Sequence, residues 1–152
     1  METINQFQYS RKSTIIGLTN IDENIWDDQP AGFPNTIRWN AGHIYATAEE
    51  FLNKADHNYA ITYPDWFDYF IDGTRPSEWD ENVPQASVIL KALKEQDERI
   101  ATYFKDKLPN KASERVDIHA LSIDTADASV QFVTWHEGLH LGIIKALVNA
   151  IE

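Results

Sequence analysis

Hydrophobic residues recur at intervals of three and four along four long stretches of the chain, and this spacing is typical of amphipathic helices. The predicted helices cover residues 3–24, 36–52, 85–108 and 124–149. A Pro-Ala-Gly-Phe-Pro run at residues 30–34 separates the first two. Asn35 and Asp124 are of the residue type that caps helix N-termini, so we expect them to begin the second and fourth helices.

Two connections separate the other helices. Residues 53–84 are rich in aromatic side chains and include a candidate short helix at 65–71, whereas residues 111–121 form a polar connection. A connection as long as the first can run the length of a bundle, so the helices that it joins should be parallel. The predicted fold is therefore an all-α four-helix bundle in up-down-down-up order, with a long crossover between helices two and three, formed by one domain over residues 1–152.

The candidate chemistry lies on the last helix. His136 and His140 are one helical turn apart, on the stripe that also carries Val133 and Ile144. Side chains at this spacing are neighbours on a helix, so their imidazoles can bind one metal ion. The alternative is a pair of core histidines whose ring nitrogens bond to neighbouring polar groups.

His43 faces inward on the second helix, and by itself it has the same alternative interpretation. The predicted topology makes helices two and four antiparallel, and their rise per residue brings His43 to the level of His136 and His140. Three nitrogen ligands leave an open coordination position, as catalytic metal sites require. We therefore expect the three ring nitrogens to lie within about 4 Å of one another, with residues 59–79 near the mouth of the site. His57 and His119 are expected at the surface.

Two other metalloenzyme patterns compete with this interpretation. His136-Glu137-x-x-His140 matches the zincin signature, in which Glu137 would be the general base. We find no strand pattern that would bind a peptide, and Glu137 lies about 100° round the helix from His136. Glu137 is thus a candidate base or orienting residue, or an exposed side chain. A di-iron bundle needs two Glu-x-x-His pairs, and Glu137 with His140 is the one pair in this chain.

Composition narrows the ligands and partners. The chain has no cysteine, so a metal must be held by His, Asp, Glu or water. The formal net charge of −11 opposes binding to nucleic acid and to anionic membranes. With neither a signal-peptide pattern nor an apolar run of membrane-spanning length, the expected location is cytoplasmic. Trp39, Tyr45 and Trp135 are candidates either to line a pocket or to pack the helices together.

Three runs of sequence resemble the DinB/YfiT-like proteins. NTIRWNAGHI at residues 35–44 resembles their second-helix motif, and HEGLHLG at 136–142 resembles their last-helix motif. FIDGTRPSEW at 70–79 is similar to a Gly-Thr, Pro and Trp segment of one branch of the family. Many relatives carry a Gln after the glycine of the last motif, where this chain has Ile143.

The resemblance implies a four-helix bundle, often a homodimer, that binds a divalent metal, nickel or zinc, through His43, His136 and His140. It further implies a small-molecule substrate. Relatives include transferases or isomerases that use a low-molecular-weight thiol, and hydrolases that depend on a metal. The leading hypothesis is thus a metal-dependent hydrolase or thiol transferase. The competing hypothesis is a noncatalytic metal-binding or stress-related interaction module.

Overall fold

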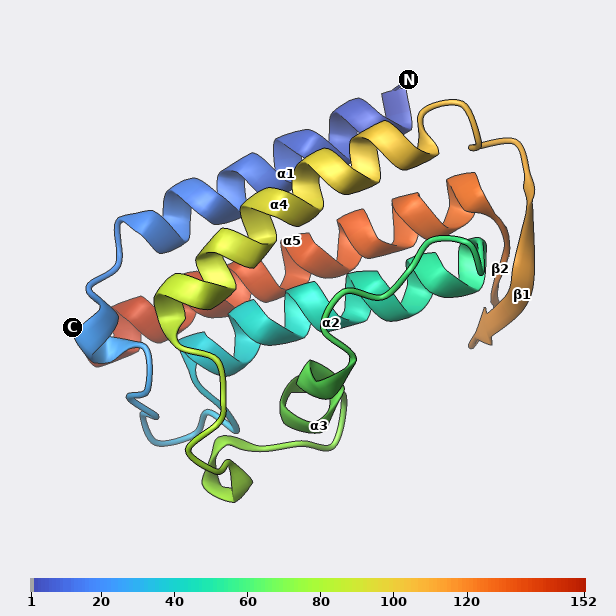
Figure 1. The fold of residues 1–152 in the computed structure, drawn as a ribbon. Coiled ribbons are helices and arrows are strands. Elements are labelled where there is room, and N and C mark those ends of the chain that lie inside the picture. Colours follow the sequence, from blue (N-terminus) through green and yellow to red (C-terminus); the bar gives the residue numbers. More distant parts are fainter. Residues whose placement is uncertain (1) are drawn as a thin grey trace.

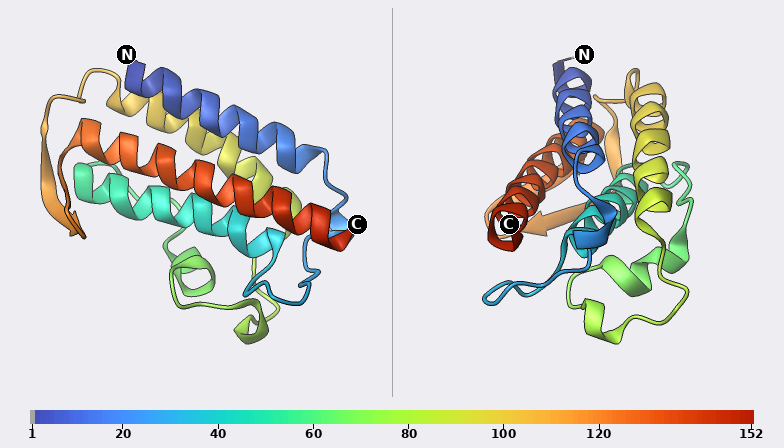
Figure 2. Two further views of the ribbon diagram at one scale, coloured as in Figure 1. Left: turned by 180° about the vertical axis from the view of Figure 1, so that it is seen from behind. Right: turned by 90° about the vertical axis from the view of Figure 1, so that its left-hand side faces the viewer.

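The computed structural model describes residues 2–152, and most of these residues are helical. The long helices are α1 (Glu2–Thr19), α2 (Ile37–Ala55), α4 (Ala86–Phe104) and α5 (Ala126–Ile151). Helices α1 and α5 run in one direction, and α2 and α4 run in the other (Figure 1). Helix α1 packs on α4 and α5, and α2 packs on the same two helices. Buried apolar residues of all four helices form two hydrophobic clusters between them. Figure 2 shows the four helices from one end.

The first helix ends earlier than its periodicity predicts, and the second begins one residue later. Asp22 accepts a hydrogen bond from the backbone of Asn24 and starts a separate 3-10 turn, η1 (Glu23–Ile25), so α1 stops at Thr19. Thr36, not Asn35, caps α2, because its hydroxyl accepts from the backbone N–H of Trp39 at 3.1 Å. The side-chain oxygen of Asn35 instead accepts a hydrogen bond from the Asn40 amide at 2.7 Å.

A small antiparallel sheet makes the all-α prediction wrong. Strands β1 (Lys111–Ile118) and β2 (Leu121–Thr125) form a hairpin where a polar connection was expected. Val116 pairs with Ile123, and apolar residues alternate with polar ones along β2 and over residues 115–118 of β1, as in a half-buried strand. Thr125 ends β2 and also caps α5 through a bond from the backbone of Ala128, so Asp124 lies within the strand and does not cap the helix.

The crossover between α2 and α4 contains η2 (Pro64–Trp66), α3 (Phe67–Phe70) and η3 (Pro76–Glu78). The first two elements lie where a short helix was predicted. Figure 1 shows the crossover running back along α2 before it enters α4. None of the helices in residues 2–152 combines the length and the hydropathy needed to cross a membrane.

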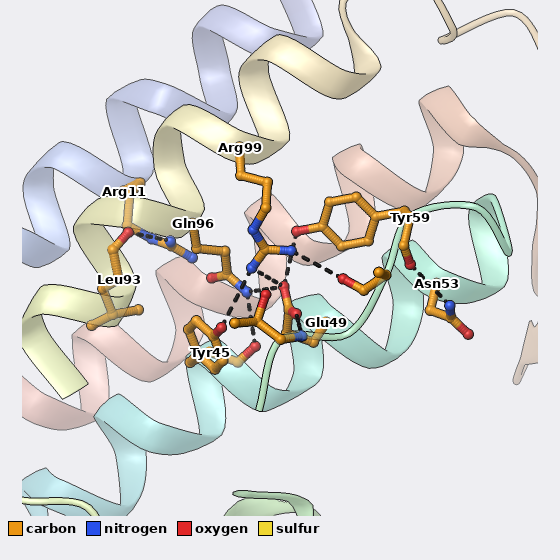
Figure 3. Close-up of polar contacts among 10 residues, drawn as sticks. Arg11, Tyr45, Glu49, Asn53, Tyr59, Leu93, Gln96 and Arg99 are labelled. Atoms are coloured by element: carbon orange, nitrogen blue, oxygen red, sulfur yellow. Dashed lines mark hydrogen bonds and ion pairs between the residues drawn. The ribbon is translucent and has the colours of Figure 1, made fainter. Parts of the chain in front are cut away.

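A buried carboxylate holds the start of the crossover against the helices (Figure 3). Glu49 of α2 is 1% exposed, and it accepts bonds from the Tyr59 hydroxyl at 2.9 Å and from the Thr62 backbone at 3.0 Å. Gln96 and Arg99 of α4 donate to the same carboxylate, both at 2.8 Å. The network joins α2, α4 and the crossover, and so limits the paths that the crossover can take past α2.

Candidate metal centre

Three histidines from two helices meet at the interface of α2 and α5. One ring nitrogen from each of His43, His136 and His140 lies within 4.8 Å of the others, a slightly wider spacing than the one predicted from the sequence. The closest pair is Nε2 of His43 and Nε2 of His136, at 3.1 Å. The antiparallel packing of α2 against α5 brings together residues that are 93 or more positions apart in the chain. These three nitrogens form a donor set of the kind that holds zinc or nickel.

The crossover and a tryptophan hold the ring of His43 in place. The ring is 2% exposed and stacks on Trp39, with centroids 4.4 Å apart and planes at 14°. Its Nδ1 lies 2.6 Å from the carbonyl oxygen of Phe70, an atom that can only accept. Nδ1 therefore carries the proton, and in the neutral ring Nε2 presents a free lone pair toward the other histidines.

The side chain of Asn40 fixes the orientation and the protonated nitrogen of the His140 ring. The Asn40 amide nitrogen donates to Asn35 Oδ1 at 2.7 Å and to the carbonyl of Thr36 at 2.8 Å. Those two bonds direct Asn40 Oδ1 toward His140 Nδ1, which lies 2.8 Å away. Nδ1–H of His140 donates to this oxygen, so Nε2 is again the free nitrogen. Metal-binding histidines are commonly oriented by such an acceptor behind the ring.

All three rings are neutral at ordinary pH. Burial, together with repulsion from the other two imidazoles, lowers the pKa of His136 to about 3. Burial together with repulsion from His43 lowers the pKa of His140 to about 4. Burial also lowers the pKa of His43, although the Phe70 carbonyl and Asp72 oppose the shift. Neutral imidazole is the form that binds a metal, so the environment favours the required protonation state.

A cavity of about 360 Å³ opens beside His43 and His136. Its apolar walls are Phe51, Ile71 and Phe132, together with Ile118 of the hairpin. The crossover thus reaches the site through Phe70, Ile71 and Asp72, which lie within residues 59–79.

Two carboxylates and a hydroxyl supply the polar part of the cavity: Glu50, Asp72 and Thr47. Oδ1 of Asp72 lies 3.6 Å from Nε2 of His43, and the Asp72 side chain is 97% exposed. A carboxylate that is close to the free nitrogen and otherwise surrounded by solvent can accept a proton or a ligand without breaking an existing contact.

Glu137, the candidate base, is buried on another side of α5. It is 1% exposed and its two oxygens accept three bonds from Arg11 of α1, at 2.9–3.1 Å. The expectation of an exposed side chain is therefore wrong, because position 137 faces α1 while His136 and His140 face α2. Arg11 also donates to the carbonyl of Leu93, so the pair joins α1, α4 and α5. Since the carboxylate is fully engaged with Arg11, we give it no part in the site chemistry.

The other candidates are distributed between core and surface. His57 and His119 lie outside the cluster, as expected, and His119 forms the hairpin turn with a φ of 51°. Tyr45 is buried against Trp66 and packs the core, whereas Trp135 is 62% exposed.

Sequence reasoning missed the parts played by Asn40, the Phe70 carbonyl and Asp72. Asn40 lies one helical turn before His43, and a polar residue at that inward position was a signal available in the sequence. Nothing local indicates the other two, because the crossover brings them to the site from residues 27 or more positions away.

Comparison with known proteins completes the description of the chain. No curated protein matches the sequence. The model of the DinB superfamily matches residues 6–144, which include all three histidines, Asn40 and Asp72. This match confirms the family that the three sequence runs indicated, and the chain belongs to the DinB superfamily.

Proposed function

We propose that this protein binds a divalent metal ion through His43, His136 and His140, and that it is a metal-dependent enzyme acting on a small molecule. The observation that supports the proposal is the arrangement of the ring nitrogens. Asn40 and the Phe70 carbonyl take the Nδ1 protons of two rings, so that two Nε2 lone pairs point at one place. Core histidines that only satisfied separate local hydrogen bonds would have no reason to bring three ring nitrogens together at one place.

Of the three rings, His136 is the one whose tautomer must adapt. With its proton on Nδ1, His43 can only accept at Nε2, so a hydrogen bond across the 3.1 Å contact needs His136 to donate from Nε2–H. Binding through Nε2 of His136 would move that proton to Nδ1. His136 is also less deeply buried than His43, so water is available to take part in this exchange.

The donor set favours nickel or zinc, because both accept imidazole nitrogen and the chain has no thiolate to offer. Such an ion would supply Lewis acidity, which lowers the pKa of a water or thiol that binds to it. Oδ1 of Asp72, 3.6 Å from Nε2 of His43, would be the nearby group that accepts the proton of that water or thiol. Water as the nucleophile would make the enzyme a hydrolase, and a low-molecular-weight thiol would make it a thiol transferase.

The cavity also favours a class of substrate. Its charged lining groups are the carboxylates of Glu50 and Asp72, and Lys54 pairs with Glu50 at 3.4 Å. An anionic substrate would meet unfavourable charge there, whereas Phe51, Phe132 and Ile71 provide apolar contact. We therefore propose a small substrate that is uncharged or cationic and has an apolar portion.

The same proposal extends to the fold and the assembly. The four long helices form one up-down-down-up bundle over residues 1–152, with the hairpin and the crossover as additions at the site. The functional unit is a homodimer in this proposal, as the family resemblance implies.

Metal analysis of untagged protein tests the site. We expect about one nickel or zinc ion per chain, and His140→Ala should lose most of it while far-ultraviolet circular dichroism stays helical. His57→Ala is the matched control, because His57 is exposed and lies outside the cluster. Equal metal content in His140→Ala and wild type would refute the ligand assignment.

Activity is tested separately on the metal-loaded protein. A panel of neutral and cationic esters and amides, and a panel of electrophiles with a low-molecular-weight thiol, would distinguish the hydrolase from the transferase. X-ray absorption that finds four protein ligands around the metal would instead favour a structural site, since no position would be open for substrate.

A further inference from the structure

Helix α5 presents an exposed face that differs in character from the rest of the surface. Its exposed residues are Gln131, Trp135, Gly138, Leu139, Gly142, Lys145, Ala146, Asn149 and Ala150. Lys145 is the single charged residue among these, in a chain with 24% charged residues. On α4, which also faces solvent, the exposed residues include Lys91, Lys94, Glu95 and Glu98. A solvated helix face should resemble α4, so the face of α5 calls for another explanation.

Apolar residues on this face follow the repeat of a helix-packing seam. Ala128, Phe132, Trp135, Leu139, Gly142 and Ala146 are separated by four, three, four, three and four residues. That alternation keeps all six on one side of the helix, as in a coiled coil. We call this row the α5 seam. Trp135 is 62% exposed and Leu139 is 48% exposed, so these two large members of the seam are uncovered in the single chain, whereas Phe132 is half-buried.

Side-chain size changes along the seam in a way that suits a two-fold axis. Large residues, Phe132, Trp135 and Leu139, occupy its first half, and Gly142 and Ala146 occupy its second. In an antiparallel pair, Leu139 of one chain meets Gly142 of the second copy, and Trp135 meets Ala146 of the second copy. A parallel pair would set Trp135 against Trp135 and leave a gap between the two Gly142 backbones. Only the antiparallel arrangement packs large residues on small ones.

Gly142 supports the same conclusion. A glycine in the interior of a helix is unfavourable relative to alanine. A Cβ built at Gly142 would meet no atom of residues 2–152 within 4 Å, so packing within the chain does not require its absence. Close approach of a second helix backbone would require it, as small residues permit in helix pairs.

The seam continues into an apolar groove between α5 and the hairpin. This groove has a volume of about 430 Å³, and its lining includes Ile118 and Leu121 besides Phe132 and Trp135. A helix pair alone is narrow: 26 residues span about 39 Å, and a strip about 10 Å wide covers only about 400 Å². A stable dimer needs about 800 Å² from each partner. A dimer at this seam would therefore have to use the groove as well. Leu121, which is 51% exposed, lines the groove beside Ala128 and Phe132, the end of the seam that faces the second copy's last helical turn in the antiparallel pair.

We propose that the α5 seam and this groove form a two-fold interface with a second copy of the same chain, in which the two α5 helices pack antiparallel. The inference rests on the homodimer of the proposed function and identifies its interface. A carboxylate-free face suits self-association of a chain with a net charge of −11, because contact elsewhere would bring acidic groups together. Ile118 and Phe132 line both the groove and the metal-site cavity, so the second copy would close one side of the cavity mouth.

Sedimentation equilibrium at micromolar concentration tests the interface. We expect the wild-type protein to sediment with twice the chain mass of 17.4 kDa. Ala146→Glu should raise the dimer dissociation constant at least tenfold, because it places a carboxylate opposite the second copy's Trp135. Val88→Glu is the matched control: Val88 is an exposed apolar residue on α4, 45% exposed, and its replacement should leave the mass unchanged.

A size swap tests the antiparallel pairing directly. Ala146→Trp alone should weaken the dimer by steric clash, and adding Trp135→Ala should restore it, because the large residue then occupies the other side of the same contact. Metal content serves as the check that the chain is folded. Wild type at monomer mass would overturn both the interface and the homodimer. A dimer unaffected by Ala146→Glu and by Ala146→Trp would overturn the interface and leave the homodimer standing.

Discussion

Gly42 lies directly before His43 in α2, and the ring of Phe70 packs against its α-carbon. A Cβ at Gly42 would lie 2.5 Å from three ring carbons of Phe70, closer than real contacts permit. The Phe70 ring is fully buried, so it has no free space to move into. Because the Phe70 carbonyl also fixes the Nδ1 proton of His43, this glycine controls both packing and the orientation of a proposed ligand.

Gly42→Ala should therefore destabilise the protein by about 1–3 kcal/mol through overpacking, although alanine is the better helix former. It should also weaken metal binding, because displacement of Phe70 moves the acceptor behind His43. Urea unfolding and metal titration measure the two effects. Gly17→Ala on α1 is the control, since its Cβ would make an ordinary 3.5 Å contact with Leu141. A stabilised Gly42→Ala variant would contradict the close packing.

At the scale of the elements, one buried ion pair connects three helices. Arg11 is fully buried on α1, bonds to Glu137 of α5 and donates to the Leu93 carbonyl of α4. Each of these charged groups would be very unfavourable in the interior without the other. The pair also keeps Glu137 turned away from the metal site, although it lies between the two histidines of the same helix.

Removing one member of this pair should cost far more than removing both. Arg11→Met leaves the Glu137 carboxylate buried and unpaired, and we expect a loss of about 3–5 kcal/mol in the free energy of unfolding. Arg11→Met combined with Glu137→Leu should recover most of that loss. Chemical denaturation of both variants provides the measurement. A single variant within about 0.5 kcal/mol of wild type, the range of ordinary surface changes, would argue against the pairing.

At the scale of the whole molecule, the three neutral histidines link stability to pH. Burial holds the pKa of His136 at about 3 and that of His140 at about 4, below the 6.5 of an unperturbed imidazole. As the pH falls below 6.5, the unfolded chain takes up protons that the folded chain does not. Stability from these groups is thus fully present above pH 6.5 and is lost as the pH falls toward the folded values.

The metal-free protein should accordingly melt at a lower temperature at pH 5 than at pH 7.5. The free energy of unfolding should fall by about 1 kcal/mol for each pH unit below 6.5 through His136 and His140 together. This value allows for screening by solvent at the partly exposed edges of the two rings. Calorimetry of the metal-free protein measures it. His136→Gln should show a shallower dependence, since one titrating group is gone. A melting temperature that is constant or rises on acidification would contradict the buried, neutral cluster.

The sequence by itself determined the long helices and the residues that face inward on them. Helical periodicity is a local property, so His43, His136 and His140 can be assigned to inner faces from their spacing alone. The family follows from sequence for the same reason, because its motifs are short runs along the chain. Helix ends were less well determined: Thr36 and Thr125 cap where Asn35 and Asp124 were expected, since neighbouring residues of similar chemistry compete for one cap.

Only the tertiary structure decided what surrounds the histidines. The acceptor at Phe70, the carboxylate of Asp72 and the bond between Arg11 and Glu137 all join residues far apart in sequence. The hairpin was missed because three consecutive polar residues, 113–115, interrupt the alternation in β1, and because its packing on α2 and α5 is a tertiary feature. Periodicity states which way a side chain faces along its own helix, whereas the packing of the other elements determines which groups it meets there.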